Sequence, residues 1–343
     1  MVHAERTLAA LRALGVDADL VSSGAPDARG YDVAHVFGIF HPPTAREQIV
    51  AVRASGAPLV LSPIWLDMRA LFATAPYLEH ALSARTSADV ERRLDRLRRV
   101  RTQLPWRGSV ARSADRRLDA QRELMLAADV VLPASEVEAY LYGERLRASR
   151  VPYVVAPLGI DDEAFAVERP RERAGVVCAG RIEPKKNQAA LLYALRDVDV
   201  EVTIVGNAFD AEYRALCARW ATPRTRFIEH LGHADVVRMM ANAAVHAHPS
   251  WLESPGLSSL EAAAAGARIV TGDQGCEREY FGPDVDYADP ADPASIRSAV
   301  LRALGREPRE RGDALERRLG AHTWQRTAEA TLEAYARALA QRP

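Results

Sequence analysis

Short apolar runs alternate with longer helical patterns along the second half of the chain. The apolar runs are rich in β-branched residues and cover 176–179, 202–205, 226–228, 244–247 and 269–271. Segments with helical spacing lie between them, at 188–196, 211–220, 235–243 and 258–265. Strands joined by connections of about 10 to 20 residues are typical of a parallel sheet built from βαβ units. The pattern therefore predicts one doubly wound α/β domain.

The first half has a similar but less regular pattern. It predicts helices at 3–14 and 44–54, strands at 19–21, 33–37, 58–61 and 130–132, and a mostly helical region at 68–128 that is broken at Pro105. In a doubly wound sheet the first strand is central, yet Met1 already stands at the start of a helix. A missing central strand would leave unpaired strand edges inside a core. We therefore expect either that the natural protein begins upstream of Met1 or that another segment fills this place.

The chain is longer than one ordinary domain, and its 343 residues suggest two domains. A break ending in Pro157-Leu158-Gly159 predicts a Rossmann-like domain at 1–157, whose first strand is absent, and a second at 158–322. Apolar residues at helical spacing predict a closing helix at 323–343 that packs back toward the first domain.

Composition narrows the function classes. The chain is 48% hydrophobic and 27% charged, as in a packed globular protein, and its net charge of -1 opposes a nucleic-acid partner. The longest stretch without a charged residue, 239–252, is 14 residues, whereas a bilayer-spanning helix needs about 20 apolar ones. Glu5 and Arg6 interrupt the region where a signal peptide would be apolar, so we expect a cytoplasmic protein. Three widely spaced cysteines are read as buried thiols.

A lysine pair marks the first candidate site. Of the 45 basic residues 43 are arginine, and the two lysines are Lys185 and Lys186, in the loop that follows the strand at 176–179. Such a loop leaves the carboxyl end of a parallel strand, where open α/β sheets bind ligands. Gly180 begins it, Arg181 offers a planar fork of donors and Lys186 a point charge, and the two charges together could hold a diphosphate. The alternative is that they are solvated loop charges.

A second candidate site follows the strand that ends near residue 247. Pro255, Gly256, Leu257 and Ser258 read as a turn into a helix, and a helix start favours phosphate. Glu253 precedes this helix and Glu261 lies about one turn inside it, so one carboxylate could reach a sugar and the other the ribose of a nucleotide. The alternative makes Glu253 a loop charge and Glu261 a surface helix residue.

Together, Gly180-Arg181-x4-Lys186 and Glu253-x7-Glu261 resemble the donor site of family-4 glycosyltransferases with the GT-B fold. The resemblance implies two Rossmann-like domains facing a cleft, with the donor on the second and the acceptor on the first. It implies that Arg181 and Lys186 bind the donor diphosphate, that Glu253 contacts the transferred sugar, that Glu261 binds the ribose, and that Gly256 and Leu257 supply backbone N–H groups.

The implied reaction is hexosyl transfer from a UDP- or GDP-sugar to an acceptor hydroxyl, with retention and without a metal or cofactor. The acceptor is left open among a saccharide, a lipid-linked saccharide and a small molecule. A nucleotide-sugar epimerase or phosphorylase of the same fold is one alternative. A non-catalytic subunit that binds sugar nucleotides is another.

The acceptor side departs from the family. Many members carry a histidine after the third strand, whereas residues 62–67 of this chain contain none. Asp67 is the only carboxylate there, and it either orients the acceptor hydroxyl or caps a helix starting near Met68. His35 and His41 are the other acceptor candidates, because both lie at or after the carboxyl end of a strand.

Three further patterns resemble metal sites or a charged surface. Asp197-x-Asp199 has the spacing of metal-dependent enzymes but precedes a strand, and His246 and His248 lack a third ligand, so we expect no metal site. Residues 85–122 carry 12 arginines against five acids. They are interpreted as a solvated helical hairpin, with an anionic acceptor or peripheral contact with the inner membrane face as the functional alternative.

Overall fold

The computed structural model describes residues 2–101 and 109–341, and the chain forms two compact units. Unit 1 comprises Met1–Asp67, Arg107–Gly159 and His322–Pro343, and unit 2 comprises Met68–Trp106 and Ile160–Ala321. The expected boundary after residue 157 lies close to the observed one after Gly159. The expected first domain differs from unit 1 in residues 68–101, which pack with the second half of the chain.

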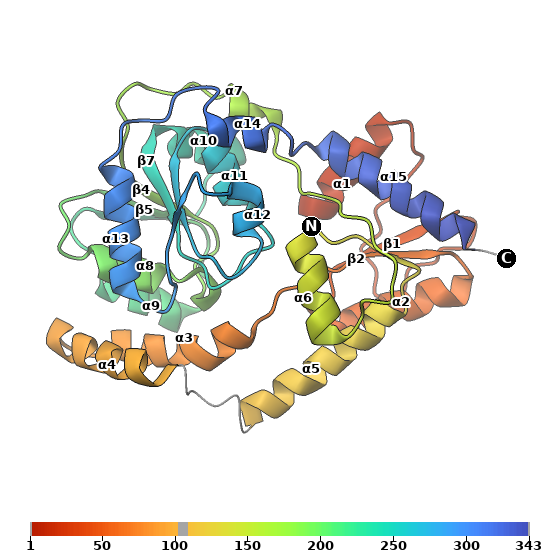
Figure 1. Ribbon diagram of the computed structural model, residues 1–343, viewed down its shortest axis with the longest axis horizontal. Coiled ribbons are helices and arrows are strands. Elements are labelled where there is room, and N and C mark those ends of the chain that lie inside the picture. Colours follow the sequence, from red (N-terminus) through yellow and green to blue (C-terminus); the bar gives the residue numbers. More distant parts are fainter. Residues whose placement is uncertain (1, 102–108, 342–343) are drawn as a thin grey trace. The chain divides into compact units, whose positions relative to one another are not determined.

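Unit 1 is built on a three-stranded parallel sheet in the order β1-β2-β3 (Figure 1). Its strands are β1 (Ala34–Phe37), β2 (Leu59–Ser62) and β3 (Val130–Val131), and its helices are α1 (Val2–Ala13), α2 (Pro42–Ser55), α5 (Ser109–Leu126), α6 (Glu136–Leu146) and α15 (Trp324–Ala340). Every residue of the middle strand β2 is buried.

One expectation is wrong: residues 19–21 form no strand. Leu20 and Val21 are exposed, and so short a segment gains little without a neighbouring strand.

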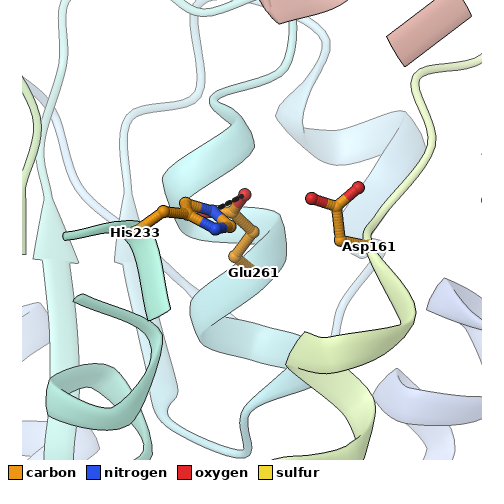
Figure 2. Close-up of side chains that lie close together, drawn as sticks. All are labelled: Asp161, His233 and Glu261. Atoms are coloured by element: carbon orange, nitrogen blue, oxygen red, sulfur yellow. Dashed lines mark hydrogen bonds and ion pairs between the residues drawn. The ribbon is translucent and has the colours of Figure 1, made fainter. Parts of the chain in front are cut away.

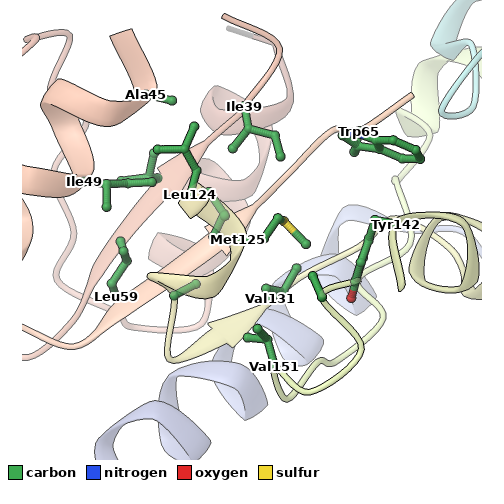
Figure 3. Packing of buried hydrophobic residues seen from close by; sticks show 14 of the residues in the cluster. Ile39, Ala45, Ile49, Leu59, Trp65, Leu124, Met125, Val131, Tyr142 and Val151 are labelled. Atoms are coloured by element: carbon green, nitrogen blue, oxygen red, sulfur yellow. The ribbon is translucent and has the colours of Figure 1, made fainter. Parts of the chain in front are cut away.

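The apolar core of unit 1 lies between its sheet and helices α2 and α5. Ile49 of α2 packs with Leu59 of β2, and with Leu124 and Met125 of α5, in one cluster (Figure 3). Helix α15 packs in a separate cluster, where Ala334 and Ala338 meet Val60 and the other residues of that group. The amphipathic closing helix is thus confirmed, and it covers the sheet through small side chains.

Unit 2 contains a six-stranded parallel sheet in the order β6-β5-β4-β7-β8-β9. The strands are β4 (Ala174–Ala179), β5 (Val202–Val205), β6 (Thr225–Ile228), β7 (Ala243–His248), β8 (Arg268–Thr271) and β9 (Asp286–Tyr287). From β4 the chain adds β5 and then β6 on one side of the sheet. It then returns to place β7 on the other side of β4, followed by β8 and β9. The order therefore reverses between β4 and β7, the position where open α/β sheets bind ligands. The five expected strands are confirmed, and β9 was not expected.

Helices cover both faces of the sheet of unit 2 (Figure 1). The helices of unit 2 after residue 160 are α7 (Asp162–Ala166), α8 (Gln188–Leu195), α9 (Ala211–Arg219), α10 (His233–Asn242), α11 (Leu257–Ala264), α12 (Glu277–Phe281), α13 (Pro293–Leu304) and α14 (Ala314–Leu319), with a short 3-10 turn at Pro184–Lys186. Helix α8 packs against α13, and α10 packs against α11. None of the helices in the described ranges is long and apolar enough to cross a membrane.

Helices α3 (Arg69–Leu82) and α4 (Ser87–Val100) belong to unit 2, although they lie in the first half of the sequence. Helix α3 contacts α8, and the Trp220 indole N–H donates to the carbonyl of Leu82 at 2.9 Å. The Tyr193 hydroxyl donates to Glu91 at 2.7 Å. The arginine-rich stretch 85–122 is therefore not one hairpin, because α4 lies in unit 2 and α5 in unit 1.

Candidate functional site

The loops that follow β4 and β5 come together at the carboxyl edge of the sheet of unit 2. Gly180 and Gly206 both adopt positive φ angles, of 149° and 141°. A Cβ atom on Gly206 would lie 2.2 Å from the carbonyl oxygen of Gly180, so only glycine fits at this contact. The two backbones thereby form one wall of a pocket.

That pocket has a volume of about 650 Å³, which suits a nucleotide-sized ligand. Four of the predicted donor residues line it: Gly180, Arg181, Ser258 and Glu261. Sequence reasoning missed other lining residues from the loops after β5 and β6, which include Asn207, Phe209 and Glu229. Phe209 is 80% exposed, an unusual state for a large aromatic side chain, and it offers a flat surface to a ring. The sequences of these loops contain no motif with a recognisable residue spacing.

Lys186 and Glu253 meet in a buried ion pair. The Lys186 ammonium lies 2.6 Å from Glu253 Oε1 and the Lys185 ammonium 3.7 Å from Oε2. The Ser250 hydroxyl also donates to Oε1, at 2.6 Å. Burial alone would raise the pKa of Glu253, but the two lysines outweigh it and hold that pKa well below its usual range. The two motifs found in the sequence are thus joined by direct contact.

The start of α11 adds backbone donors near this pair. Gly256 occupies the N-cap position and Leu257 begins the helix. A Cβ atom on Gly256 would lie 3.4 Å from the Glu253 side chain. The first N–H groups of a helix have no partner within it, so those of Leu257 and Ser258 suit an anion. The Ser258 hydroxyl lies 3.4 Å from the buried ring of His248.

Glu261 forms a second polar cluster with His233 and Asp161 (Figure 2). His233 Nε2 lies 2.9 Å from Glu261 Oε1, and one potential ligand atom of each residue lies within 4.8 Å of the others. The three come from the segment before α7, from the start of α10 and from α11. A histidine with two carboxylates is a ligand set that a divalent transition metal accepts, and it was not expected from the sequence.

The acceptor candidates of unit 1 have different surroundings. The two ring nitrogens of His35 contact the hydroxyls of Tyr335 at 3.1 Å and Ser62 at 2.9 Å, and burial lowers its pKa to about 3. His41 is exposed at the N-cap of α2 and contacts Thr44. Asp67 lies 3.3 Å from Arg145 of α6. Met68 is the N-cap of α3, so Asp67 stands one residue before the cap position.

The remaining patterns have structural explanations. Asp197 pairs with Arg297, and Asp199 pairs with Arg224 at 2.6 Å, so each aspartate has an arginine partner of its own. His246 and His248 are buried, and burial lowers the pKa of His246 to about 3. The three cysteines are buried free thiols, as expected.

The arginines of α4 divide between half-buried and exposed positions. Val90, Leu94 and Leu97 are buried, Arg98 pairs with Asp292 at 2.9 Å, and Arg101, which follows the helix, pairs with Asp289. Arg92, Arg96 and Arg99 are exposed. Of the arginine-rich stretch, residues 102–108 lie outside the described residues.

Comparison with known proteins agrees with this geometry. Residues 160–317 match the family described as "Glycosyl transferases group 1". The matched segment spans somewhat less than half of the chain. It contains all the donor-side residues discussed above and most of unit 2.

Among curated proteins, a D-inositol 3-phosphate glycosyltransferase of Arthrobacter sp. (strain FB24) is 34% identical over 215 residues, which cover 54% of this chain and 50% of the relative. The chain thus spans about half the length of the curated relatives it matches.

Among solved structures, a sucrose-phosphate synthase from Thermosynechococcus elongatus has a TM-score of 0.66 at 18% identity, covering 91% of this chain and 75% of that one. The Anabaena protein HepE, solved with UDP and glucose, has a TM-score of 0.57 at 17% identity, covering 90% and 74%. These likenesses concern the fold, which is GT-B: an α/β protein with parallel sheets in both units.

Proposed function

We propose that this protein is a glycosyltransferase that moves a hexosyl group from a nucleoside diphosphate sugar, such as a UDP- or GDP-sugar, to an acceptor hydroxyl. The observation that carries the proposal is the meeting of both sequence motifs at the switch point of unit 2, where Lys186 pairs with the buried Glu253. The group 1 domain match supports it independently. The Anabaena neighbour that was solved with UDP and glucose is consistent with such a donor.

Each donor residue has a role that follows from its position. Arg181, whose side chain is 61% exposed at the pocket, and Lys186 stabilise the negative charge that develops on the leaving diphosphate. The start of α11 adds backbone N–H donors to the same anion. Glu253 is ionised and contacts the transferred sugar, while Glu261 accepts hydrogen bonds from the ribose hydroxyls. The charges that assist departure are therefore in place before the donor binds.

Transfer with retention and without a metal or cofactor is part of the proposal. It is supported by the resemblance of the donor motifs to the family-4 enzymes, and by lysine and arginine side chains that can neutralise a diphosphate. The cluster of Asp161, His233 and Glu261 makes chelation an informative test. We expect turnover to survive EDTA, whereas loss on chelation with recovery on adding Mn²⁺ or Zn²⁺ would assign that cluster to metal chemistry.

The acceptor is proposed to bind unit 1. Both ring nitrogens of His35 already contact hydroxyls, so Asp67 and the exposed His41 are better placed to meet a ligand. Asp67 is an ion-paired carboxylate, which suits orientation of an acceptor hydroxyl more than proton abstraction. A retaining transfer does not require a strong base.

Peripheral contact with an anionic surface is proposed for the outer side of α4. Arg92, Arg96 and Arg99 are exposed, and their spacing places them on one face of the helix. Sedimentation with vesicles that contain anionic lipid, at low and high salt, tests this contact. Equal binding of the protein to anionic and to neutral vesicles would contradict this proposed contact.

The decisive experiment for the function is a thermal-shift panel of nucleotide sugars followed by product analysis. A ligand that binds only the folded state raises the melting temperature. The best donor is then incubated with candidate acceptors and without acceptor. A glycosylated product supports the transferase, an isomerised donor indicates an epimerase, and cleavage by inorganic phosphate indicates a phosphorylase. Tight donor binding without any product indicates a non-catalytic binding subunit.

A further inference from the structure

A second buried carboxyl lies close to Glu253 and has the opposite electrostatic environment. Glu277, the first residue of α12, is 1% exposed. Its Oε2 accepts the backbone N–H of Gly275 at 2.9 Å. Among the described atoms, its Oε1 is buried and has no hydrogen-bond partner. A buried carboxylate oxygen without a partner is costly, and such groups require an explanation.

The loop held by Glu277 packs directly on the loop that carries Glu253. The N–H of Cys276 donates to the carbonyl of Glu253 at 3.2 Å. A Cβ atom on Gly275 would lie 2.1 Å from that same carbonyl, and one on Gly272 would lie 2.2 Å from the carbonyl of Ser250. The loops after β7 and β8 therefore touch backbone to backbone, and a shift of one displaces the other.

We propose that Glu277 is a positioning residue for sugar transfer, which in its neutral form holds the loop Gly272–Cys276 against Glu253. The inference rests on the proposed function, since Glu253 is the residue assigned to the sugar. Contact runs from Glu277 to Gly275, from the next residue Cys276 to Glu253, and from Glu253 to Lys186. Ionisation of Glu277 would add a negative charge beside Glu253 and loosen this chain of contacts.

The charged surroundings of Glu277 agree with a neutral acid. Burial, together with the nearby carboxylates of Glu253 and Asp273, raises its pKa to about 8, against the opposing effect of backbone N–H groups that include that of Gly275. From β9, the Tyr287 hydroxyl faces the backbone carbonyl of Glu277, and burial keeps the pKa of that tyrosine near 12.

The cations around α12 are engaged elsewhere. Arg278 stacks on the Tyr287 ring and pairs with Asp273 at 3.2 Å. Arg318 of α14 lies at the other end of α12, beside Gly282, and pairs with Asp284. Lys185 and Lys186 contact Glu253. None of these described cations forms an ion pair with Glu277.

The test is the pH profile of turnover in matched variants. The donor is whichever of UDP-glucose, UDP-N-acetylglucosamine and GDP-mannose gives the largest thermal shift, and nucleoside diphosphate release is followed from pH 6 to 9.5. Wild-type kcat is expected to fall above about pH 8 with the loss of one proton. Glu277→Gln should keep kcat at pH 7 within about threefold and lack that decline, because its amide stays neutral and still accepts from Gly275.

Glu277→Asp provides the complementary test. Withdrawing the carboxyl by one methylene removes the hydrogen bond to Gly275, so kcat should fall at least ~10-fold, whereas the Kd of the free nucleoside diphosphate should stay within twofold. Glu279→Gln, which removes an exposed carboxylate from the same helix, is the matched control and should match wild type. An alkaline decline that persists unchanged in Glu277→Gln, or full kcat in Glu277→Asp, would overturn the proposal.

If the wild-type chain turns over none of these donors, the proposed function fails while the positioning contact is still measurable. Melting temperatures of Glu277→Ala, Glu253→Gln and the double variant then form a cycle. If the effects of the two single variants on the melting temperature are not additive in the double variant, the two loops are in contact as proposed. Strict additivity overturns this contact.

Discussion

Removing the Lys186 charge tests the centre of the proposed site. In Lys186→Ala, Glu253 stays buried and keeps the Ser250 hydroxyl and the more distant ammonium of Lys185, but it loses its partner at 2.6 Å. Breaking a buried ion pair by removing one partner costs roughly 3–5 kcal/mol. Part of that cost comes from the orphaned charge, and protonation of Glu253 limits this part. The ordinary pKa is 4.5, so protonating this carboxyl at pH 7 costs about 3.4 kcal/mol.

We therefore expect Lys186→Ala to lose about 3 kcal/mol of unfolding free energy at pH 7. The sign of the pH dependence follows from the lowered pKa of Glu253 in the folded protein. A lowered pKa contributes stability above the unfolded value near 4.5 and loses it as the pH falls toward the folded value. The wild type keeps this contribution at pH 4, which still lies above the folded value, whereas the cost of protonating the orphaned carboxyl of the variant falls as the pH falls. The difference in stability between wild type and variant should thus become smaller from pH 7 to pH 4.

Urea unfolding at pH 7 and pH 4 measures both values, and Lys186→Ala/Glu253→Gln is the matched control. The double variant contains no orphaned charge and should recover most of the lost stability. Its turnover should nevertheless stay at least ~100-fold below wild type, since the leaving diphosphate still lacks its cation. A stability loss that is equal at both pH values, or a double variant less stable than Lys186→Ala, would refute the reasoning.

Three further variants separate the other roles. Arg181→Ala should lower kcat/KM at least ~100-fold in initial-rate assays without changing the melting temperature, because its side chain is largely exposed; near-normal turnover would remove it from the site. Glu261→Ala should raise the Kd of the free nucleoside diphosphate about 10-fold by calorimetry, and an unchanged Kd would argue against ribose contact. Asp67→Asn should lower transfer to acceptor more than donor hydrolysis, and equal transfer rates would limit Asp67 to its pairing with Arg145.

The sequence predicts unit 2 better than unit 1 for a physical reason. The strands of unit 2 are buried between two layers of helices, so they appear as continuous apolar runs such as Val202–Val205. Residues 19–21 contain only two apolar residues after Asp19, and so short a run cannot show whether a neighbouring strand will pair with it. The local sequence pattern indicates a possible strand, whereas the strand that would pair with it depends on the whole fold.

Long-range packing also explains the placement of α3 and α4. Their helical periodicity is visible in the sequence, and the three buried apolar residues of α4 follow it. The pattern does not say which surface they cover. That choice depends on distant groups such as Tyr193 and Trp220, which bond to the hairpin across more than a hundred residues.

The donor motifs were recognisable because both combine fixed spacing with residue types suited to an anion. Phe209 and Glu277 belong to no such spacing. Phe209 lies in a loop after β5, and Glu277 is a single acid in an acidic stretch, so only the fold reveals that one lines the pocket and the other is buried. Opposite pKa shifts in two neighbouring glutamates arise because two lysines face Glu253 while no described cation pairs with Glu277.

The structure also explains why the only two lysines of an arginine-rich chain stand together. Both ammonium groups reach the same buried carboxylate, and the Lys186 side chain is only 13% exposed. A guanidinium is a planar fork that needs more room and bonds best to two oxygens side by side, whereas Oε1 already accepts from Ser250. We therefore expect Lys186→Arg to lose at least ~10-fold in kcat although the charge is kept. Initial rates at saturating donor test this, and wild-type kcat would mean that charge alone is required.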